Sequence, residues 1–216
     1  MFASRLRVLL TAAIVAAAVV EISAHRRDEY LQAARVAVDE RRVDVELDLT
    51  PGIAVAAAVT AEIDRNGDSR LSPEEQHDYV RRVLNDAALH VDGRAVRLQA
   101  VESSFPDPAA FDRGEGTIRI HAAADLPRLA SGSHQVLFRN AHRRDLGVYL
   151  ANALVPQTSA VAIGAQRRDP DQRELTIDYS LTASDAPSSS RLWLFALCGA
   201  AVAVAFVLRP SAPRQL

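Results

Sequence analysis

The stretch Val43-Asp44-Val45-Glu46-Leu47-Asp48-Leu49 alternates apolar and acidic residues without interruption. Successive side chains of a β-strand point to opposite faces, so this pattern predicts a strand with one buried face and one solvated face. Val36–Val38 predicts a preceding strand, and the polar residues 39–42 predict the turn between the two. The stretch therefore favours a domain built mainly from β-strands.

Short apolar segments bounded by turn residues return in the second half of the chain. The dipeptide Asp92-Gly93 is typical of a hairpin turn. Further strands are predicted at Leu89–Val91, Ala95–Gln99, Thr117–His121, Gln135–Arg139, Val148–Leu154, Ala160–Ile163 and Glu174–Leu181. Many short strands separated by turns predict a β-sandwich-like fold.

One helical segment interrupts this β pattern. Ile53–Ile63 is rich in alanine and valine without alternation, which predicts a helix. A polar loop follows, and Ser72-Pro73-Glu74-Glu75 has the capping residues of a helix start, so a second helix is expected to run to about Ala87. The result is an inserted helix–loop–helix over residues 53–87.

The loop between these helices, Asp64–Glu75, matches the twelve-residue calcium loop of an EF-hand. Calcium takes six to eight oxygen ligands, which the loop supplies from alternating positions. The predicted ligands are the side chains of Asp64, Asn66, Asp68 and Glu75, the backbone carbonyl of Arg70, and Ser72 acting through water.

Ser69 departs from the pattern, because the sixth position is normally a glycine with positive φ. A non-glycine residue in that conformation costs about 1 kcal/mol. With only three carboxylates among the ligands, we expect a dissociation constant of roughly 10⁻⁵ to 10⁻³ M. The alternative interpretation is a polar turn followed by a capped helix. A lone loop of this kind favours a structural calcium site over a sensor.

The two ends of the chain predict export and membrane anchoring. Residues 1–24 have the basic start and short apolar run of a signal peptide, with an uncleaved anchor as the alternative. Residues 192–208 are uncharged and apolar, which predicts a transmembrane helix, with a buried core helix as the alternative. The chain then divides into an exported domain at 25–183, a linker at 184–191, the span, and a cytoplasmic tail at 209–216.

Composition excludes several classes of function. The formal net charge of −2 provides no electrostatic footprint for nucleic acid. The single cysteine, Cys198, excludes an intrachain disulfide. No nucleophile elbow, phosphate loop or zinc-protease motif occurs, so a non-enzymatic protein is expected.

A second metal hypothesis concerns the mature N-terminus. Cleavage after residue 24 would expose His25, whose amine and imidazole can bind copper or nickel with a second histidine. The histidines available for that role are His90, His121, His134 and His142, and no spacing selects one of them. The basic run Arg139–Asp145 predicts a solvated loop or, alternatively, a contact with a partner.

Several short motifs carry a family resemblance. They include Asp48-Leu49-Thr50-Pro51-Gly52, the loop from Asp64, Phe138-Arg139-Asn140 and the run Tyr149–Pro156. With these motifs the chain resembles the exported domain that precedes the membrane part of HupE/UreJ-type transporters. The resemblance implies a membrane-protein partner such as a metal transporter. This chain has one candidate span, so it is not expected to form a transport path alone.

Overall fold

The computed structural model describes residues 29–182. The predicted signal peptide, His25, the linker, the transmembrane segment and the cytoplasmic tail lie outside these residues. Within the described part of the chain, no helix is long and apolar enough to span a bilayer.

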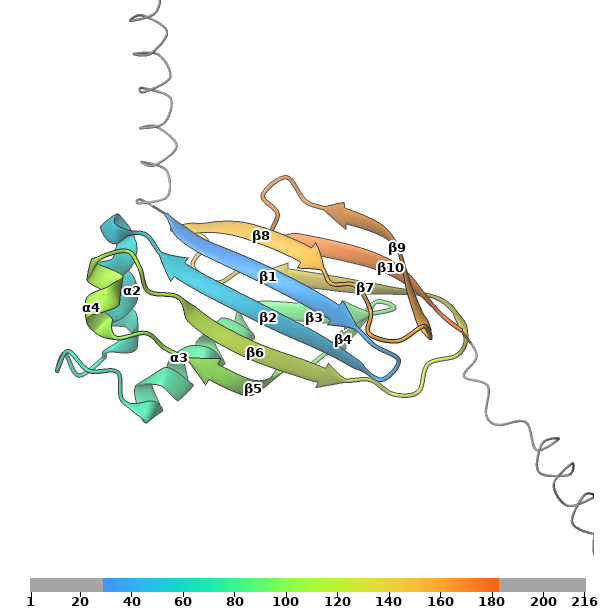
Figure 1. The fold of residues 1–216 in the computed structure, drawn as a ribbon, viewed down its shortest axis with the longest axis horizontal. Coiled ribbons are helices and arrows are strands. Elements are labelled where there is room, and N and C mark those ends of the chain that lie inside the picture. Colours follow the sequence, from blue (N-terminus) through green and yellow to red (C-terminus); the bar gives the residue numbers. More distant parts are fainter. Residues whose placement is uncertain (1–28, 183–216) are drawn as a thin grey trace, which may run out of the picture. The chain divides into compact units, whose positions relative to one another are not determined.

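Two five-stranded sheets form a β-sandwich-like fold (Figure 1). The first sheet has the order β5-β6-β2-β1-β8 and contains β1 (Tyr30–Val38), β2 (Arg42–Pro51), β5 (Gln99–Ser104), β6 (Ile118–Asp125) and β8 (Gly147–Ala153). The second has the order β4-β3-β7-β10-β9 and contains β3 (Ala87–Val91), β4 (Arg94–Val96), β7 (Gly132–Asn140), β9 (Val161–Arg168) and β10 (Glu174–Leu181). The predicted mainly β fold class is confirmed.

Strand β2 shows how the alternating sequence builds the core. Its inward residues, Val43 to Leu49 at every second position, are fully buried. Its acidic residues point outward, where Arg35 of β1 bonds Glu46 at 2.9 Å and Asp48 at 2.8 Å. These exposed ion pairs add little stability, so burial of the apolar face supplies most of the driving force.

Strand β1 lies between β2 and β8 in the first sheet and pairs differently with these two neighbours. It runs antiparallel to β2 through the turn at residues 39–41 and parallel to β8. A parallel partner requires a long connection, and here the chain passes through both sheets before β8 returns beside β1. The N-terminal and C-terminal halves of the domain are thereby joined in one sheet.

Three helices gather at one end of the sandwich (Figure 1). Helix α2 (Ile53–Ile63) follows β2, and helix α3 (Pro73–Asn85) leads into β3. Helix α4 (Pro108–Asp112) contacts α2. The expected helix–loop–helix is therefore present, and in chain order it connects the first sheet to the second.

Three local expectations differ from the structure. Helix α3 was expected to run to about Ala87 but ends at Asn85. Strand β3 already starts at Ala87, which pairs with Asn140 of β7. The prediction of one strand over Ala95–Gln99 is wrong. Strand β4 ends at Val96 and β5 begins at Gln99, and the buried Leu98 lies in the break between them. Strand β5 itself was not predicted, because all of its residues are exposed at the sheet edge and leave no alternating pattern.

The two faces of β10 provide a test of the sandwich. Ile177 is fully buried, whereas its neighbour Thr176 points to the other face. We expect Ile177→Ala to lower the free energy of unfolding by about 2–5 kcal/mol through the lost apolar contact and the cavity. The control Thr176→Ala should cost about 0.5 kcal/mol. Urea unfolding checks both values, and equal losses would contradict the assignment of the faces.

Candidate calcium site

The loop starts where α2 ends and finishes inside the first turn of α3. Asp64 is the C-cap of α2 and donates its N–H to the carbonyl of Thr60 at 2.8 Å. Ser72 caps α3: its hydroxyl accepts from the N–H of Glu75 at 3.3 Å, and its own N–H donates to Glu75 Oε2 at 3.0 Å. The predicted capping box is confirmed, and it fixes Glu75 relative to the loop.

The carboxylate of Asp64 organises the middle of the loop. Its Oδ1 accepts from the N–H groups of Gly67 at 2.8 Å and Asp68 at 3.2 Å. Its Oδ2 accepts from the N–H of Ser69 at 2.8 Å. The chain therefore curls around this one side chain, which a solvated polar turn does not require.

Ser69 adopts the conformation that the sixth position of a calcium loop demands. Its φ is 61°, in the left-handed region that glycine normally occupies. Gly67 also has a positive φ, of 72°. The loop thus takes up the expected sharp turn despite the missing glycine, at a backbone cost of about 1 kcal/mol.

Glu75 closes the loop from the opposite side. Its Oε1 accepts from the N–H of Arg65 at 2.9 Å, and its Oε2 accepts from the Ser72 hydroxyl at 2.9 Å. Hydrogen bonds from the backbone and then the hydroxyl of Ser72 lower the pKa of Glu75 below its ordinary value. The carboxylate is therefore ionised at neutral pH.

The remaining predicted ligands, Asn66, Asp68 and Arg70, are exposed in the loop. Asn66 accepts from the N–H of Asp68 at 2.8 Å, and its amide donates to Asp68 Oδ2 at 3.4 Å. The side chain of Arg70 is exposed, and its N–H donates to Asp68 Oδ1 at 2.9 Å. The structure thus connects Asp64, Asn66 and Asp68, while Glu75 closes the loop through Arg65 and Ser72.

The donor set fits calcium in its chemistry, because every side-chain donor is an oxygen and three of them are carboxylates. However, no three Asp, Glu, His or Cys residues within 29–182 are grouped as a metal ion would require. The carboxylates accept N–H bonds of the loop instead. Binding would therefore require Glu75 to exchange its bond from Arg65 for the cation.

The sequence did not reveal a buried polar cluster beneath the helices. We call it the His142 cluster; its members are joined by hydrogen bonds and are Tyr30, Gln32, Tyr79, Asp86, Asn140, His142 and Tyr149. The side chain of His142 is only 1% exposed. Its Nε2 lies 3.1 Å from the Tyr79 hydroxyl, and its Nδ1 lies 2.8 Å from Asp86 Oδ2.

One arrangement of protons satisfies the chain of bonds through His142. A carboxylate only accepts, so Nδ1 of His142 donates to Asp86. Nε2 then accepts from Tyr79, which accepts from Tyr30 at 2.6 Å. Burial raises the pKa of both tyrosines, so their hydroxyls keep the protons that this chain requires.

Backbone groups complete the His142 cluster. The carbonyl of His142 accepts from Gln32 Nε2 at 2.8 Å and from the Tyr149 hydroxyl at 2.7 Å. Gly147 makes this possible, because a Cβ there would lie 2.6 Å from that hydroxyl. The segment that follows β7 is thereby fixed to β1 of the other sheet.

Ion pairs extend this connection to α2. Glu62 bonds Arg143 at 2.7 Å, and Arg82 of α3 donates to the carbonyl of Glu62 at 2.7 Å. Arg82 also lies over the ring of Tyr79 at 5.6 Å. The run Arg139–Asp145 is therefore not simply a solvated loop, since it contains the buried His142.

The four histidines considered as partners of His25 have different surroundings. His142 has both ring nitrogens occupied, and His121 bonds Asp44 at 2.7 Å. His134 lies between an acidic side chain and a carbonyl. Nδ1 of His90 is buried and has no hydrogen-bond partner among the described residues.

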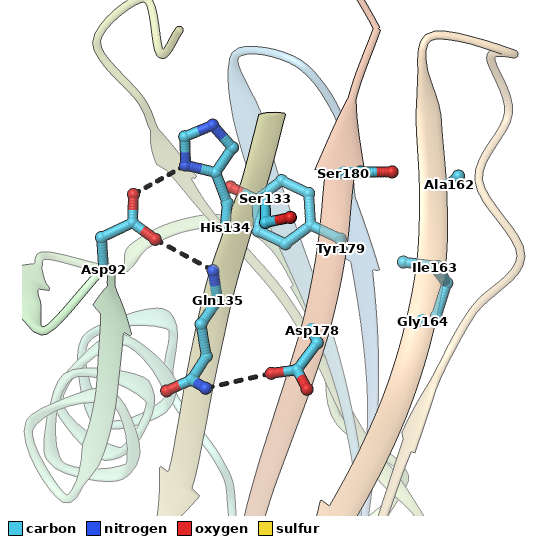
Figure 2. A pocket seen from close by; sticks show the side chains of 10 residues that line it. All are labelled: Asp92, Ser133, His134, Gln135, Ala162, Ile163, Gly164, Asp178, Tyr179 and Ser180. Carbon is cyan, nitrogen blue, oxygen red and sulfur yellow. Dashed lines mark hydrogen bonds and ion pairs between the residues drawn. The ribbon is translucent and has the colours of Figure 1, made fainter. Parts of the chain in front are cut away.

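His134 and Asp92 form a charged contact beside a shallow polar pocket of about 570 Å³ (Figure 2). His134 Nδ1 lies 2.8 Å from Asp92 Oδ2, and Nε2 lies 2.7 Å from the carbonyl of Ala130. Both neighbours only accept, so they favour the imidazolium. The Ala130 carbonyl and then the Asp92 carboxylate raise the pKa of His134. Burial opposes ionisation of Asp92, yet the bonds from His134 and from the N–H of Gln135, with the nearby positive charge, together lower its pKa.

This contact predicts a pH dependence of stability. The raised pKa of His134 contributes stability that is complete below its ordinary pKa of about 6.5 and is lost as the pH rises through the folded value. Tyr179, which packs on His134 at 5.5 Å, has a pKa raised by burial to about 12 and does not titrate in this range.

The test is Asp92→Asn, which keeps an oxygen for the N–H of Gln135 and tolerates the φ of 50° at this position. We expect a loss of about 1 kcal/mol at about pH 6, because Asp92 is partly exposed. The loss should shrink toward about pH 9. Denaturant unfolding at several pH values measures it, and a constant difference would contradict the assignment.

Comparisons with protein-family models, with curated proteins and with solved structures found no match to this chain.

Proposed function

We propose that the loop Asp64–Glu75 binds one calcium ion and that the domain is a non-enzymatic, exported module held to a membrane. The observation that supports calcium most strongly is the backbone of Ser69. A serine held at a φ of 61° around the carboxylate of Asp64 is the local geometry that the sequence pattern requires. A capping box alone gives no reason for that turn.

The side chains of Asp64, Asn66, Asp68 and Glu75 would hold the ion, together with the carbonyl of Arg70 and a water on Ser72. Calcium would supply positive charge among three carboxylates that otherwise depend on backbone N–H groups. It would stabilise the folded loop by mass action, because the unfolded chain does not bring these residues together.

The attachment of the helices supports a structural role rather than a switch. Helix α3 carries Tyr79, which bonds into the His142 cluster, and α2 carries Glu62, which pairs with Arg143. Opening the helices would break buried hydrogen bonds, each of which costs about 1–3 kcal/mol to leave unsatisfied. Calcium would therefore tighten the loop without moving the helices far.

Membrane attachment through residues 192–208 and association with a transporter are further parts of the proposal. The first is supported by the apolar sequence of that segment. The second is supported by the resemblance to the exported domain of HupE/UreJ-type transporters.

The alternative is a copper or nickel site at His25. It is disfavoured where a second histidine is needed, because His121, His134 and His142 already bond acceptors within the domain. His90 is the candidate partner that has no hydrogen bond at Nδ1 among residues 29–182. Binding of copper that is lost on blocking the N-terminal amine would favour this alternative.

The loop proposal predicts the effect of Glu75→Gln. Removing one carboxylate charge and one bidentate oxygen should weaken calcium binding at least tenfold, or about 1.4 kcal/mol. The control Glu74→Gln changes the neighbouring glutamate, which is exposed in the first turn of the same helix. It should bind calcium like the native chain.

Calorimetric titration of the full chain in nonionic detergent measures both variants. The native chain should bind one calcium ion with a dissociation constant of roughly 10⁻⁵ to 10⁻³ M. At a hundredfold excess over that constant, calcium should add about 2.7 kcal/mol to the free energy of unfolding. No heat of binding at millimolar calcium, or equal binding by Glu75→Gln, would contradict the proposal and show that the loop is a polar turn followed by a capped helix.

Relief of backbone strain predicts a second change in affinity. Ser69→Gly removes the cost of a left-handed serine, about 1 kcal/mol. The free loop can relax part of this strain and the calcium-bound loop cannot, so the glycine variant should bind calcium up to about fivefold more tightly. Ser69→Ala keeps the strain and serves as the control. The same titration compares them, and tighter binding by the alanine variant would contradict this explanation.

A further inference from the structure

A groove of about 760 Å³ lies between α3 and the β3–β4 hairpin. One wall is a single face of α3, formed by His77, Val80, Arg81 and Leu84. These positions recur at helical spacing, so they line the groove along the helix. The opposite wall includes Val96, and the segment that follows β4 closes the groove.

The floor of the groove is apolar and made largely of small side chains. Ala87, Ala88, Ala95 and Ala100 line it, which explains why a hollow remains between the helix and the hairpin. Val80 is buried, and Leu84 and Val96 are partly buried against the core. A ligand here would meet hydrocarbon over most of its length.

The charged residues of the groove all have one sign. None of its lining residues is Asp or Glu, although the chain contains 27 acidic residues. Its permanent cations are Arg81 and Arg97. Arg81 is paired with Asp78 at 2.9 Å, whereas Arg97 makes no ion pair within the part of the chain that the structure describes.

We propose that this groove binds a long-chain fatty acid, with the alkyl chain on the alanine floor and the carboxylate at Arg97. The unpaired guanidinium of Arg97 beside the apolar groove complements a ligand that has one negative charge at the end of a hydrocarbon chain. The volume lies within the range of small-molecule sites.

An extended peptide fits the groove less well. A peptide that adds to a sheet edge depends on backbone hydrogen bonds along that edge. Strand β4, the edge of the second sheet here, contains only the residues Arg94–Val96. The apolar floor and the single-sign charge therefore favour an acyl chain, and this inference does not depend on calcium binding.

The test uses the full chain in nanodiscs of neutral phosphatidylcholine with a palmitate analogue that carries a diazirine. After irradiation, mass spectrometry locates the adducts along the chain. We expect adducts within α3 and residues 87–100, and competition by unlabelled palmitate but not by hexadecanol. Arg97→Gln should lower this labelling at least fivefold.

Two variants separate binding from folding. Arg94→Gln removes a cation from the same hairpin but outside the groove, and should label like the native chain. Ala88→Trp fills the floor and should abolish labelling, with an unchanged urea unfolding transition as the check that the domain is folded. Adducts spread over other surfaces, full labelling of Arg97→Gln, equal competition by hexadecanol, or stronger competition by phosphatidylglycerol would each overturn the proposal.

Discussion

The hydrogen bonds of His142 are the constraint on which the rest of the domain depends. The buried side chain of His142 bonds Tyr79 on α3 and Asp86 at the end of α3. The backbone carbonyl of His142 accepts hydrogen bonds from Gln32 of β1 and Tyr149 of β8. Both sheets and the helical insertion therefore meet at one residue. A buried polar group without a partner is costly, so each element must take its position for the others to be satisfied. In a core that is otherwise apolar, the cluster favours one arrangement of the sheets and helices over others.

The loop Asp64–Glu75 connects the same two helices and has a different balance of forces. Its carboxylates are partly or fully exposed and are held by backbone N–H groups, so little apolar burial stabilises it. The rigid helices fix the two ends of the loop, and this reduces the entropy that an ion would have to overcome. A cation among Asp64, Asp68 and Glu75 would then act on a frame that is already in place. Ends that are fixed by the helices favour the proposed structural role of calcium over a switch.

The sequence predicted those features that arise from local patterns. The alternating β2, the helix Ile53–Ile63 and the capping box at Ser72 are set by short-range periodicity and hydrogen bonding, and the structure has all three. The His142 cluster could not be predicted, because its members Gln32 and Asn140 are far apart in the chain and carry no spacing. Strand β5 was missed for a related reason, since an exposed edge strand needs no apolar alternation. For the calcium loop, the sequence indicated the residue types, and the structure added the left-handed backbone of Ser69.

Hydrogen exchange of the full chain with and without calcium tests the central claim most directly, because it reports on each backbone N–H of the loop. The account predicts slower exchange over residues 64–75 in calcium, greatest at Ser69 and Gly67, whose N–H groups bond the carboxylate of Asp64. It predicts little change at His142, whose bonds are already complete without the ion. Unchanged exchange throughout the loop at millimolar calcium would contradict the account, and so would protection confined to another part of the domain.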